Sequence, residues 1–244
     1  MLSLKKDKLL HIFTFFDLKN AKDKTEIWIA TKNRRNGYLI QYDKKIIHTH
    51  GDAECLPQLF KRIDAAEAKF AIEPQHLAQL EKLYVPTEPS DAASPGNITT
   101  YLIMSMRPKH FRPSIAHEVR KMSSNDLNQV SADLGKEYRD KAEQALHSGI
   151  ALGIREKQHW VSAAFVPEII EHVGLIRGVY TTPAFRGKGF STSTVSALVK
   201  ELFRLRLQPG LWVAGDNVPA RRVYEKIGFK PSTIPLLGFT AKRK

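Results

Sequence analysis

The residues best suited to chemistry lie in one short turn, Arg186-Gly187-Lys188-Gly189-Phe190-Ser191. Its two glycines let a ligand approach the backbone, and its two cations add positive charge. A helical pattern follows at once, so the unpaired amides of a first helical turn and the positive end of the helix dipole would face the same ligand. This combination is typical of a phosphate or diphosphate site. The spacing differs from the P-loop, G-x-x-x-x-G-K-[ST], and from the dinucleotide fingerprint, G-x-G-x-x-G.

A second group of residues lies further along the chain, between Gly215 and Phe229. Asn217 is a good helix N-cap, and a proline two residues later suits the first turn of a helix. Tyr224 falls on the apolar side of this helix, which Gly228 would end. A tyrosine near its ordinary pKa of about 10 can protonate a leaving thiolate. Asn217 as a simple cap and Tyr224 as a core tyrosine remain the structural alternatives.

Both groups require a strand before them and a helix after them. The β-branched residues in 173–182 predict a strand, which Pro183 ends because proline cannot donate to a ladder. Residues 211–214 predict a second, shorter strand. The helix between them has an apolar face formed by Val195, Leu198, Val199, Leu202 and Phe203. The order strand, glycine turn, helix, strand, helix therefore positions both groups.

These two signatures resemble those of the GNAT superfamily of N-acetyltransferases. The turn fits R-x-x-G-x-[GA] except that Ser191 replaces the last glycine or alanine, and the second helix fits N-x-P-A-x-x-x-Y-x-x-x-G-F. The resemblance covers roughly residues 120–230 and implies the GNAT fold, an α/β (α+β) fold with a mixed, mostly antiparallel sheet flanked by helices. The two-part organisation also resembles the glycine N-acyltransferase-type branch, in which the acceptor is a small amine or amino acid.

The resemblance implies transfer of an acetyl group from acetyl-CoA to a primary amine by direct attack in a ternary complex. Backbone groups of Val179, Tyr180 and Thr181 would pair with the pantetheine arm and polarise the thioester carbonyl. Asn217 would contact the cofactor near its thiol, and Tyr224 would protonate the departing thiolate. The pyrophosphate would bind to the amides of the turn, in Arg186, Gly187, Lys188, Gly189, Phe190 and Ser191.

The base that deprotonates the attacking amine is left unassigned. Some GNAT proteins carry a glutamate five residues before the asparagine, where this chain has Trp212. Glu168, Glu171 and His172 are the alternatives, acting directly or through a water. Each could equally be a solvated surface residue.

Charge is distributed unevenly along the chain. Residues 1–97 hold 15 Lys and Arg against 13 Asp and Glu, while residues 98–244 hold 23 against 12, of a total net charge of +13. The excess lies in the half with the glycine turn, where it would attract a polyanion. Nucleic acid would use the same charge, but the basic residues do not alternate with aromatic ones as in a base-stacking stripe. A basic nucleic-acid-binding protein and an inactive, CoA-binding GNAT-like protein are the two alternative functions.

Composition also bears on cofactors, compartment and partners. The single cysteine and the absence of histidine pairs at ligand spacing predict neither a disulfide framework nor a metal site. No run of 18 apolar residues and no signal peptide are evident, so we expect a cytoplasmic protein without a membrane span. The acceptor would be a small-molecule amine or a peptide amine, and a homodimer is left open.

The N-terminal half predicts the same order of elements without the glycine turn. Strands are expected at 25–31, 38–42 and 45–49, with turns at 32–37 and 43–44. A helix near 56–63, a strand at 70–72 and a Pro74-led helix carrying Leu77, Leu80 and Tyr84 follow. Acidic residues in Gly51-Asp52-Ala53-Glu54 replace the cations of the other turn. We therefore predict a smaller α/β domain over 1–97, either a degenerate GNAT-like half or an unrelated meander, and a catalytic domain over 98–244, joined by a proline-rich linker at 86–97.

Overall fold

The computed structural model describes residues 9–90, 94–148 and 150–244. Contacts divide the chain into two compact units. The first unit extends to residue 103 and includes 213–217 and 232–244, and the second holds 104–212 and 218–231. The units differ from a simple division after residue 97, because the last strand of the chain lies in the first unit. The two predicted domains, 1–97 and 98–244, stay a prediction.

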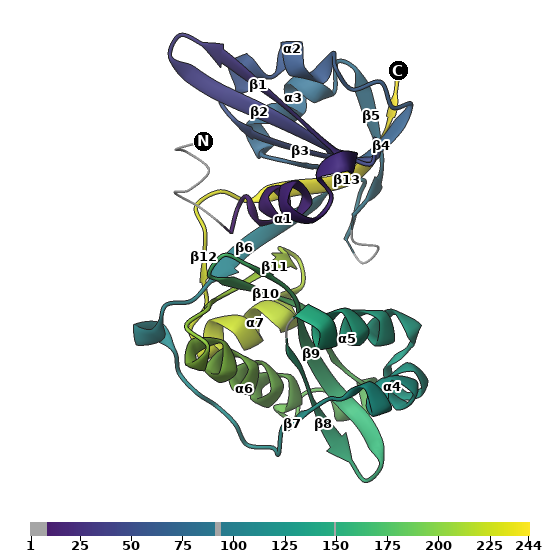
Figure 1. The fold of residues 1–244 in the computed structure, drawn as a ribbon, viewed down its shortest axis with the longest axis vertical. Coiled ribbons are helices and arrows are strands. Elements are labelled where there is room, and N and C mark those ends of the chain that lie inside the picture. Colours follow the sequence, from purple (N-terminus) through teal and green to yellow (C-terminus); the bar gives the residue numbers. More distant parts are fainter. Residues whose placement is uncertain (1–8, 91–93, 149) are drawn as a thin grey trace. The chain divides into compact units, whose positions relative to one another are not determined.

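A mixed sheet forms the first unit (Figure 1). Three strands pair antiparallel in chain order, the fourth is parallel to the third, and the last strand of the chain pairs antiparallel with the fourth. That last strand also pairs with β5 and β6. The strands are β1 (Thr25–Lys32), β2 (Arg35–Tyr42), β3 (Ile46–Gly51), β4 (Glu67–Ile72), β5 (Tyr84–Pro89), β6 (Thr99–Ser105) and β13 (Leu236–Arg243).

Two tight turns join the first three strands. Asn33 and Arg34 have φ values of 50° and 62°, and Asp43 and Lys44 have values of 48° and 53°. Two successive residues at positive φ match the twist of the strands they connect, as in type I′ hairpins. The turn predicted at 32–37 is therefore wrong in length, because β2 already begins at Arg35.

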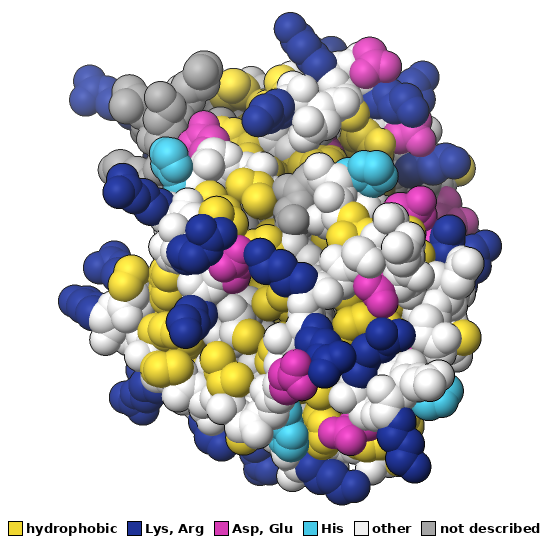
Figure 2. Space-filling model, turned by 60° about the horizontal axis from the view of Figure 1, so that its bottom comes forward, with side chains coloured by type: hydrophobic (Ala, Val, Ile, Leu, Met, Phe, Trp, Pro, Cys, Tyr) yellow, Lys and Arg dark blue, Asp and Glu magenta, His cyan; other side chains and the backbone are white. Residues whose placement is uncertain are grey.

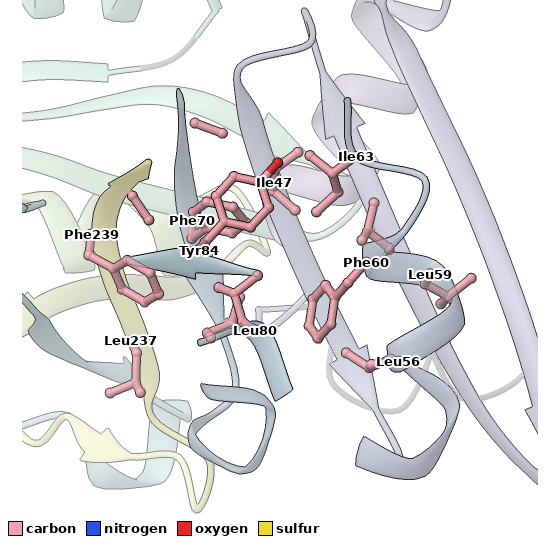
Figure 3. Close-up of a cluster of buried hydrophobic side chains, with 14 of the residues drawn as sticks. Ile47, Leu56, Leu59, Phe60, Ile63, Phe70, Leu80, Tyr84, Leu237 and Phe239 are labelled. Carbon is pink, nitrogen blue, oxygen red and sulfur yellow. The ribbon is translucent and has the colours of Figure 1, made fainter. Parts of the chain in front are cut away.

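Short helices and aromatic rings fill the core of the first unit (Figure 3). The helices are α1 (Ile12–Asn20), α2 (Pro57–Phe60) and α3 (Leu77–Leu80). The ring of Phe70 stacks on Phe239 with centroids 5.6 Å apart and meets Tyr84 edge-on at 5.2 Å. Burying each of these side chains stabilises the fold by about 2 kcal/mol. Tyr84 belongs to β5 and not to the Pro74-led helix, so that prediction is wrong, and β5 also occupies the start of the predicted linker.

The second unit contains a sheet in which three antiparallel strands are followed by a parallel one (Figure 1). These strands are β8 (Ile150–Glu156), β9 (His159–Ile170), β10 (Val173–Thr181) and β11 (Gln208–Ala214). Two short strands complete it: β7 (Arg120–Lys121) pairs with β8, and β12 (Lys230–Pro231) pairs with the end of β6. The predicted mixed, mostly antiparallel sheet is confirmed.

Helices cover both faces of this sheet. On one face α4 (Leu127–Leu134) and α5 (Lys136–Ser148) pack Val130 and Ala142 into a cluster with Phe165 of β9. On the other face α6 (Phe190–Arg204) approaches so closely that a Cβ on Gly174 would lie 2.5 Å from Leu202. The last helix, α7 (Val218–Ile227), packs beside α6. Among the helices in the described parts of the chain, none is long and apolar enough to cross a membrane.

The two units repeat one order of elements. In each, three antiparallel strands lead through a helix to a strand parallel to the third, and a second helix follows. The connecting helix differs greatly in length, because α2 has 4 residues and α6 has 15. The repeated order agrees with the predicted GNAT-like first half, whose origin stays a prediction.

Candidate active site

The glycine turn connects β10 to α6 and leaves open space above its backbone. Gly187 and Gly189 have φ values of 75° and 84°, in the left-handed region that glycine adopts without strain. A Cβ on Gly187 would meet nothing within 4 Å, and a Cβ on Gly189 would approach only His117 Nε2, at 3.8 Å. A ligand can therefore reach the backbone of this turn.

Amides at the start of α6 face that space without internal partners. Gly189 is the N-cap, and the first bond along the helix runs from Ser193 N–H to Gly189 O at 3.0 Å. The amides of Phe190, Ser191 and Thr192 precede that bond, and within the described residues none of them has a hydrogen-bond acceptor. Free amides at the positive end of a 15-residue helix are a favourable environment for an anion.

Both cations of the turn are exposed but tied to nearby backbone. Arg186 Nε donates to Thr181 O at 3.0 Å, and its guanidinium lies 5.8 Å from the centre of the Tyr180 ring. Lys188 Nζ donates to Ala184 O at 3.0 Å. These contacts shape the turn and keep two positive charges beside the free amides.

A chain of hydroxyl groups lies beneath the turn and explains the departure at Ser191. Ser191 Oγ is 2.6 Å from Thr181 Oγ1, which is 2.9 Å from Ser162 Oγ. Ser162 Oγ is in turn 3.1 Å from Thr194 Oγ1, whose hydroxyl donates to Phe190 O at 3.0 Å. The chain links β9, β10 and α6. The Ser191 side chain therefore points inward and leaves its amide available, as glycine or alanine would.

An extended segment before β7, residues 111–117, packs along α6 and supports the turn. His117 Nε2 is 2.9 Å from Lys188 O, and its ring stacks on Phe190 with centroids 4.0 Å apart. Ser193 Oγ and Ser196 Oγ accept from backbone amides of the same segment, at 3.0 and 2.8 Å. His117 was not among the predicted site residues, because a contact across 71 residues leaves no local signal in the sequence.

β10 presents an open edge next to the turn. Its pairing with β11 is recorded only from Val173 to Leu175, so Val179, Tyr180 and Thr181 have no partner there among the described residues. Ser162 Oγ donates to Tyr180 O at 3.1 Å from the β9 side. Because the N–H and C=O of a trans peptide point in opposite directions, the Thr181 N–H points away from β9, toward the open edge. Thr181 O already accepts from Arg186. The Thr181 N–H is therefore the group of this residue that can donate a hydrogen bond to a ligand at the open edge.

Tyr224 lies in the second turn of α7 and is 6% exposed. Its ring meets Phe229 edge-on at 5.8 Å, and its hydroxyl has no hydrogen-bond partner among the described residues. Burial raises the pKa of this hydroxyl, so it stays protonated at neutral pH but is a weaker acid than an exposed tyrosine. Asn217 immediately precedes α7, and its N–H donates to Ala214 O at 3.0 Å. Asn217 lies in the first unit by contacts and Tyr224 in the second.

One of the three alternative bases is buried. Glu168 is 7% exposed, and its Oε1 accepts from Arg177 Nη1 at 2.7 Å. Its Oε2 is also buried and has no hydrogen-bond partner within the described residues. Glu171 and His172 are exposed in the turn that follows β9. No group of three or more histidine, cysteine, aspartate or glutamate side chains in the described residues could hold a metal ion.

Comparison with known families supports the sequence signatures. A family model described as FR47-like protein matches residues 151–234, which contain β9, β10, the glycine turn, α6, β11 and α7. No curated protein matches the chain. The resemblance to GNAT N-acetyltransferases predicted from the two signatures is confirmed.

Solved structures share the fold over almost the whole chain. A GCN5-related N-acetyltransferase from Kribbella flavida is 14% identical, with a TM-score of 0.62, covering 96% of this chain and 95% of its own. A GNAT-family acetyltransferase from Colwellia psychrerythraea is also 14% identical, with a TM-score of 0.59 and coverages of 97% and 90%. A GCN5-related N-acetyltransferase-like protein from Streptococcus suis is 13% identical, with a TM-score of 0.54 and coverages of 98% and 93%. These likenesses establish the GNAT fold.

Proposed function

We propose that this chain, which has the GNAT fold, is an N-acetyltransferase that transfers the acetyl group of acetyl-CoA to a primary amine. The observation that carries the proposal is the pairing of two features in the second unit. Free amides at the N-terminus of α6 lie in an open glycine turn, and the unpaired edge of β10 leads directly into that turn. One feature suits a diphosphate and the other suits the amide groups of a pantetheine arm.

In the proposed reaction the amine nitrogen attacks the thioester carbon and the carbon–sulfur bond breaks. The Thr181 N–H, next to the turn, would donate a hydrogen bond to the pantetheine arm. Tyr224 would give its proton to the leaving thiolate. Burial raises the pKa of the hydroxyl, and the same apolar surroundings would raise the proton affinity of the thiolate, so the transfer stays favourable. Asn217 would contact the cofactor near its sulfur.

For the base we propose Glu168. An amine must lose a proton during attack, and a carboxylate with one oxygen fixed by Arg177 and the other unpaired can accept it, directly or through a water. Glu171 and His172 lack this burial. Replacing Glu168 by Gln keeps its shape and removes the acceptor charge, so turnover should fall by about 100-fold or more at unchanged CoA affinity.

For the acceptor we propose only a chemical class, a primary amine. The comparisons and the fold support an amine, either a small molecule or a peptide amine, and we expect the protein to work in the cytoplasm without a metal. Lys and Arg side chains are scattered over the face shown in Figure 2, with acidic side chains between them. The basic residues do not alternate with aromatic ones in the sequence, which favours a compact anion such as CoA over a nucleic-acid strand.

The test is release of free thiol from acetyl-CoA in the presence of a panel of amines, with direct measurement of CoA binding alongside. We expect CoA to bind and at least one amine class to accelerate thiol release. Tight CoA binding without acceleration by any amine would favour the inactive CoA-binding alternative. Binding of nucleic acid that CoA does not displace would favour the other alternative, a basic nucleic-acid-binding protein.

A further inference from the structure

A second polar site lies in the first unit, far in sequence from the glycine turn. A pocket of about 1060 Å³ opens there between β1, β2, the end of β3 and the segment after β4. Its walls include Ile27 and Ile29 of β1, and its deepest polar residues are His11, His50 and Glu73. Nothing in the proposed acetyl transfer uses these residues.

The polar floor of this pocket is a connected network. Glu73 Oε1 accepts from the Gly51 N–H at 3.1 Å and contacts His50 Nδ1 at 3.2 Å, and Glu73 Oε2 accepts from Gln75. His76 joins the same loop through Gly51 O at 2.9 Å. His50 and Glu73 are only 2% and 4% exposed. Burying so many polar groups is costly unless their positions serve the fold or a ligand.

The floor presents hydrogen-bond acceptors to the pocket. Burial alone would raise the pKa of Glu73, but hydrogen bonds from His50 and Gly51 and the nearby His76 hold it below its usual value, so the carboxylate is ionised. His50 therefore donates through Nδ1, which leaves a lone pair on Nε2 when the ring is neutral. Nε2 has no hydrogen-bond partner among the described residues. A ligand with hydrogen-bond donors would therefore pair with the Glu73 carboxylate and with His50 Nε2.

The charge and the walls restrict the ligand further. Three carboxylates line the pocket, in Asp52, Glu54 and Glu73. Asp52 pairs with Arg35 at 3.2 Å and Glu54 with Lys32 at 3.5 Å, so the negative charge without a lysine or arginine partner is that of Glu73. This excess of negative charge contrasts with the net charge of +13 of the whole chain. The wall is apolar and exposed, since Ile27 and Ile29 are 37% and 62% exposed. Alternate residues of one strand face the same side, so the two isoleucines form one surface.

We propose that this pocket binds a small amphipathic amine, with its ammonium group at Glu73 and His50 and its apolar body against Ile27 and Ile29. The pocket shares no residue with the glycine turn, and its ligand carries the opposite charge to CoA. The proposal does not rest on acetyl transfer, and all binding measurements below omit acetyl-CoA.

The test compares three probes with the same six-carbon body: hexylamine, hexan-1-ol and hexanoate. Binding to the full chain is followed by calorimetry and by amide shifts in NMR spectra. We expect hexylamine to bind saturably and hexanoate at least tenfold more weakly, with shifts that concentrate on β1, β2 and the end of β3. Equal affinity of the three probes, or no binding of hexylamine, would overturn the proposal.

Two pairs of variants locate the binding. Glu73→Gln should weaken hexylamine at least tenfold, whereas the exposed Glu81→Gln should leave it unchanged. Ile29→Lys adds a positive charge to an exposed position and should weaken hexylamine at least tenfold without unfolding the protein, whereas Val85→Lys on β5, 47% exposed, should have no effect. If Glu73→Gln fails to fold, Ile29→Lys decides alone, and unchanged hexylamine affinity in that variant would overturn the site. A network that only holds β3 to β4 would give a lower melting temperature in Glu73→Gln and no bound probe in the wild type, which also overturns it.

Discussion

Gly189→Ala separates two consequences of the geometry of the glycine turn. The residue has φ = 84°, where a Cβ costs about 1 to 2 kcal/mol. The nearest neighbour of that Cβ, His117 Nε2, would lie 3.8 Å away, so no steric clash adds to this cost. For a chain of 244 residues we expect the melting temperature to fall by roughly 3 to 6 °C. The protein should still fold.

The effect on cofactor binding should be larger than this loss of stability suggests. The Cβ would project from the turn into the open space where the diphosphate is proposed to lie, and would separate it from the amides that begin α6. Losing one charge-assisted hydrogen bond costs about 1.5 to 3 kcal/mol. The Kd for CoA should therefore rise about 10- to 100-fold.

Gly96→Ala is the matched control, measured by the same thermal unfolding and CoA calorimetry. Gly96 has φ = 75°, and a Cβ there would meet nothing within 4 Å, whereas a Cβ on Gly189 would make one ordinary van der Waals contact at 3.8 Å. It should lower the melting temperature to a similar extent and leave the Kd for CoA unchanged. If Gly189→Ala lost stability but bound CoA within twofold of the wild type, the diphosphate would not bind at this turn and the reasoning would be refuted.

Four further perturbations test other parts of the structure. Tyr224→Phe should lower kcat by at least 100-fold with CoA affinity within twofold, and full turnover would remove its role as acid. His117→Ala removes the stacking on Phe190 and the contact with Lys188 O, so the Kd for CoA should rise several-fold while His159→Ala, an exposed control, leaves it unchanged. Ser191→Ala breaks the bond to Thr181 and should lower the free energy of unfolding by about 1 kcal/mol in urea titrations, with near-normal activity. Burial and the nearby His50 lower the pKa of His48 to about 3. The stability from this shift is complete above pH 6.5 and falls as the pH drops, by about 2 kcal/mol between pH 6.5 and 5. Because burial also lowers the pKa of His11 to about 3, His48→Gln should reduce the loss measured in urea titrations at the two pH values by this amount and leave the part due to His11.

Local patterns made the second unit predictable. The strand before Pro183, the two glycines and the apolar face from Val195 to Phe203 each depend on neighbouring residues, so the sequence alone predicts β10, the turn and α6. The hairpins of the first unit were also predicted, although Asn33-Arg34 at positive φ makes a shorter turn than expected. In these cases the information lies within a window of about ten residues.

The other parts of the fold could not be predicted, because they depend on contacts between residues far apart in the sequence. The final strand β13 has an apolar sequence, but its place beside β4 depends on Phe239 meeting Phe70, 169 residues earlier. The histidines of the first-unit pocket come together in the same way. His48 and His50 lie near the end of β3, and the contact of His50 with Glu73 follows only from the parallel pairing of β3 with β4.

The two units have the same order of elements, but the turns after β10 and after β3 suit ligands of opposite charge. At the end of β10 the glycines are open and cations surround free amides. At the end of β3 a Cβ on Gly51 would lie 2.4 Å from Asn36 O, so the backbone there is closed by its neighbour, and Asp52 caps the next turn by accepting from Glu54 N–H at 3.0 Å. A carboxylate at the cap and a closed backbone exclude a diphosphate. The first unit therefore cannot duplicate the proposed cofactor site, and its polar floor is free to serve a cation.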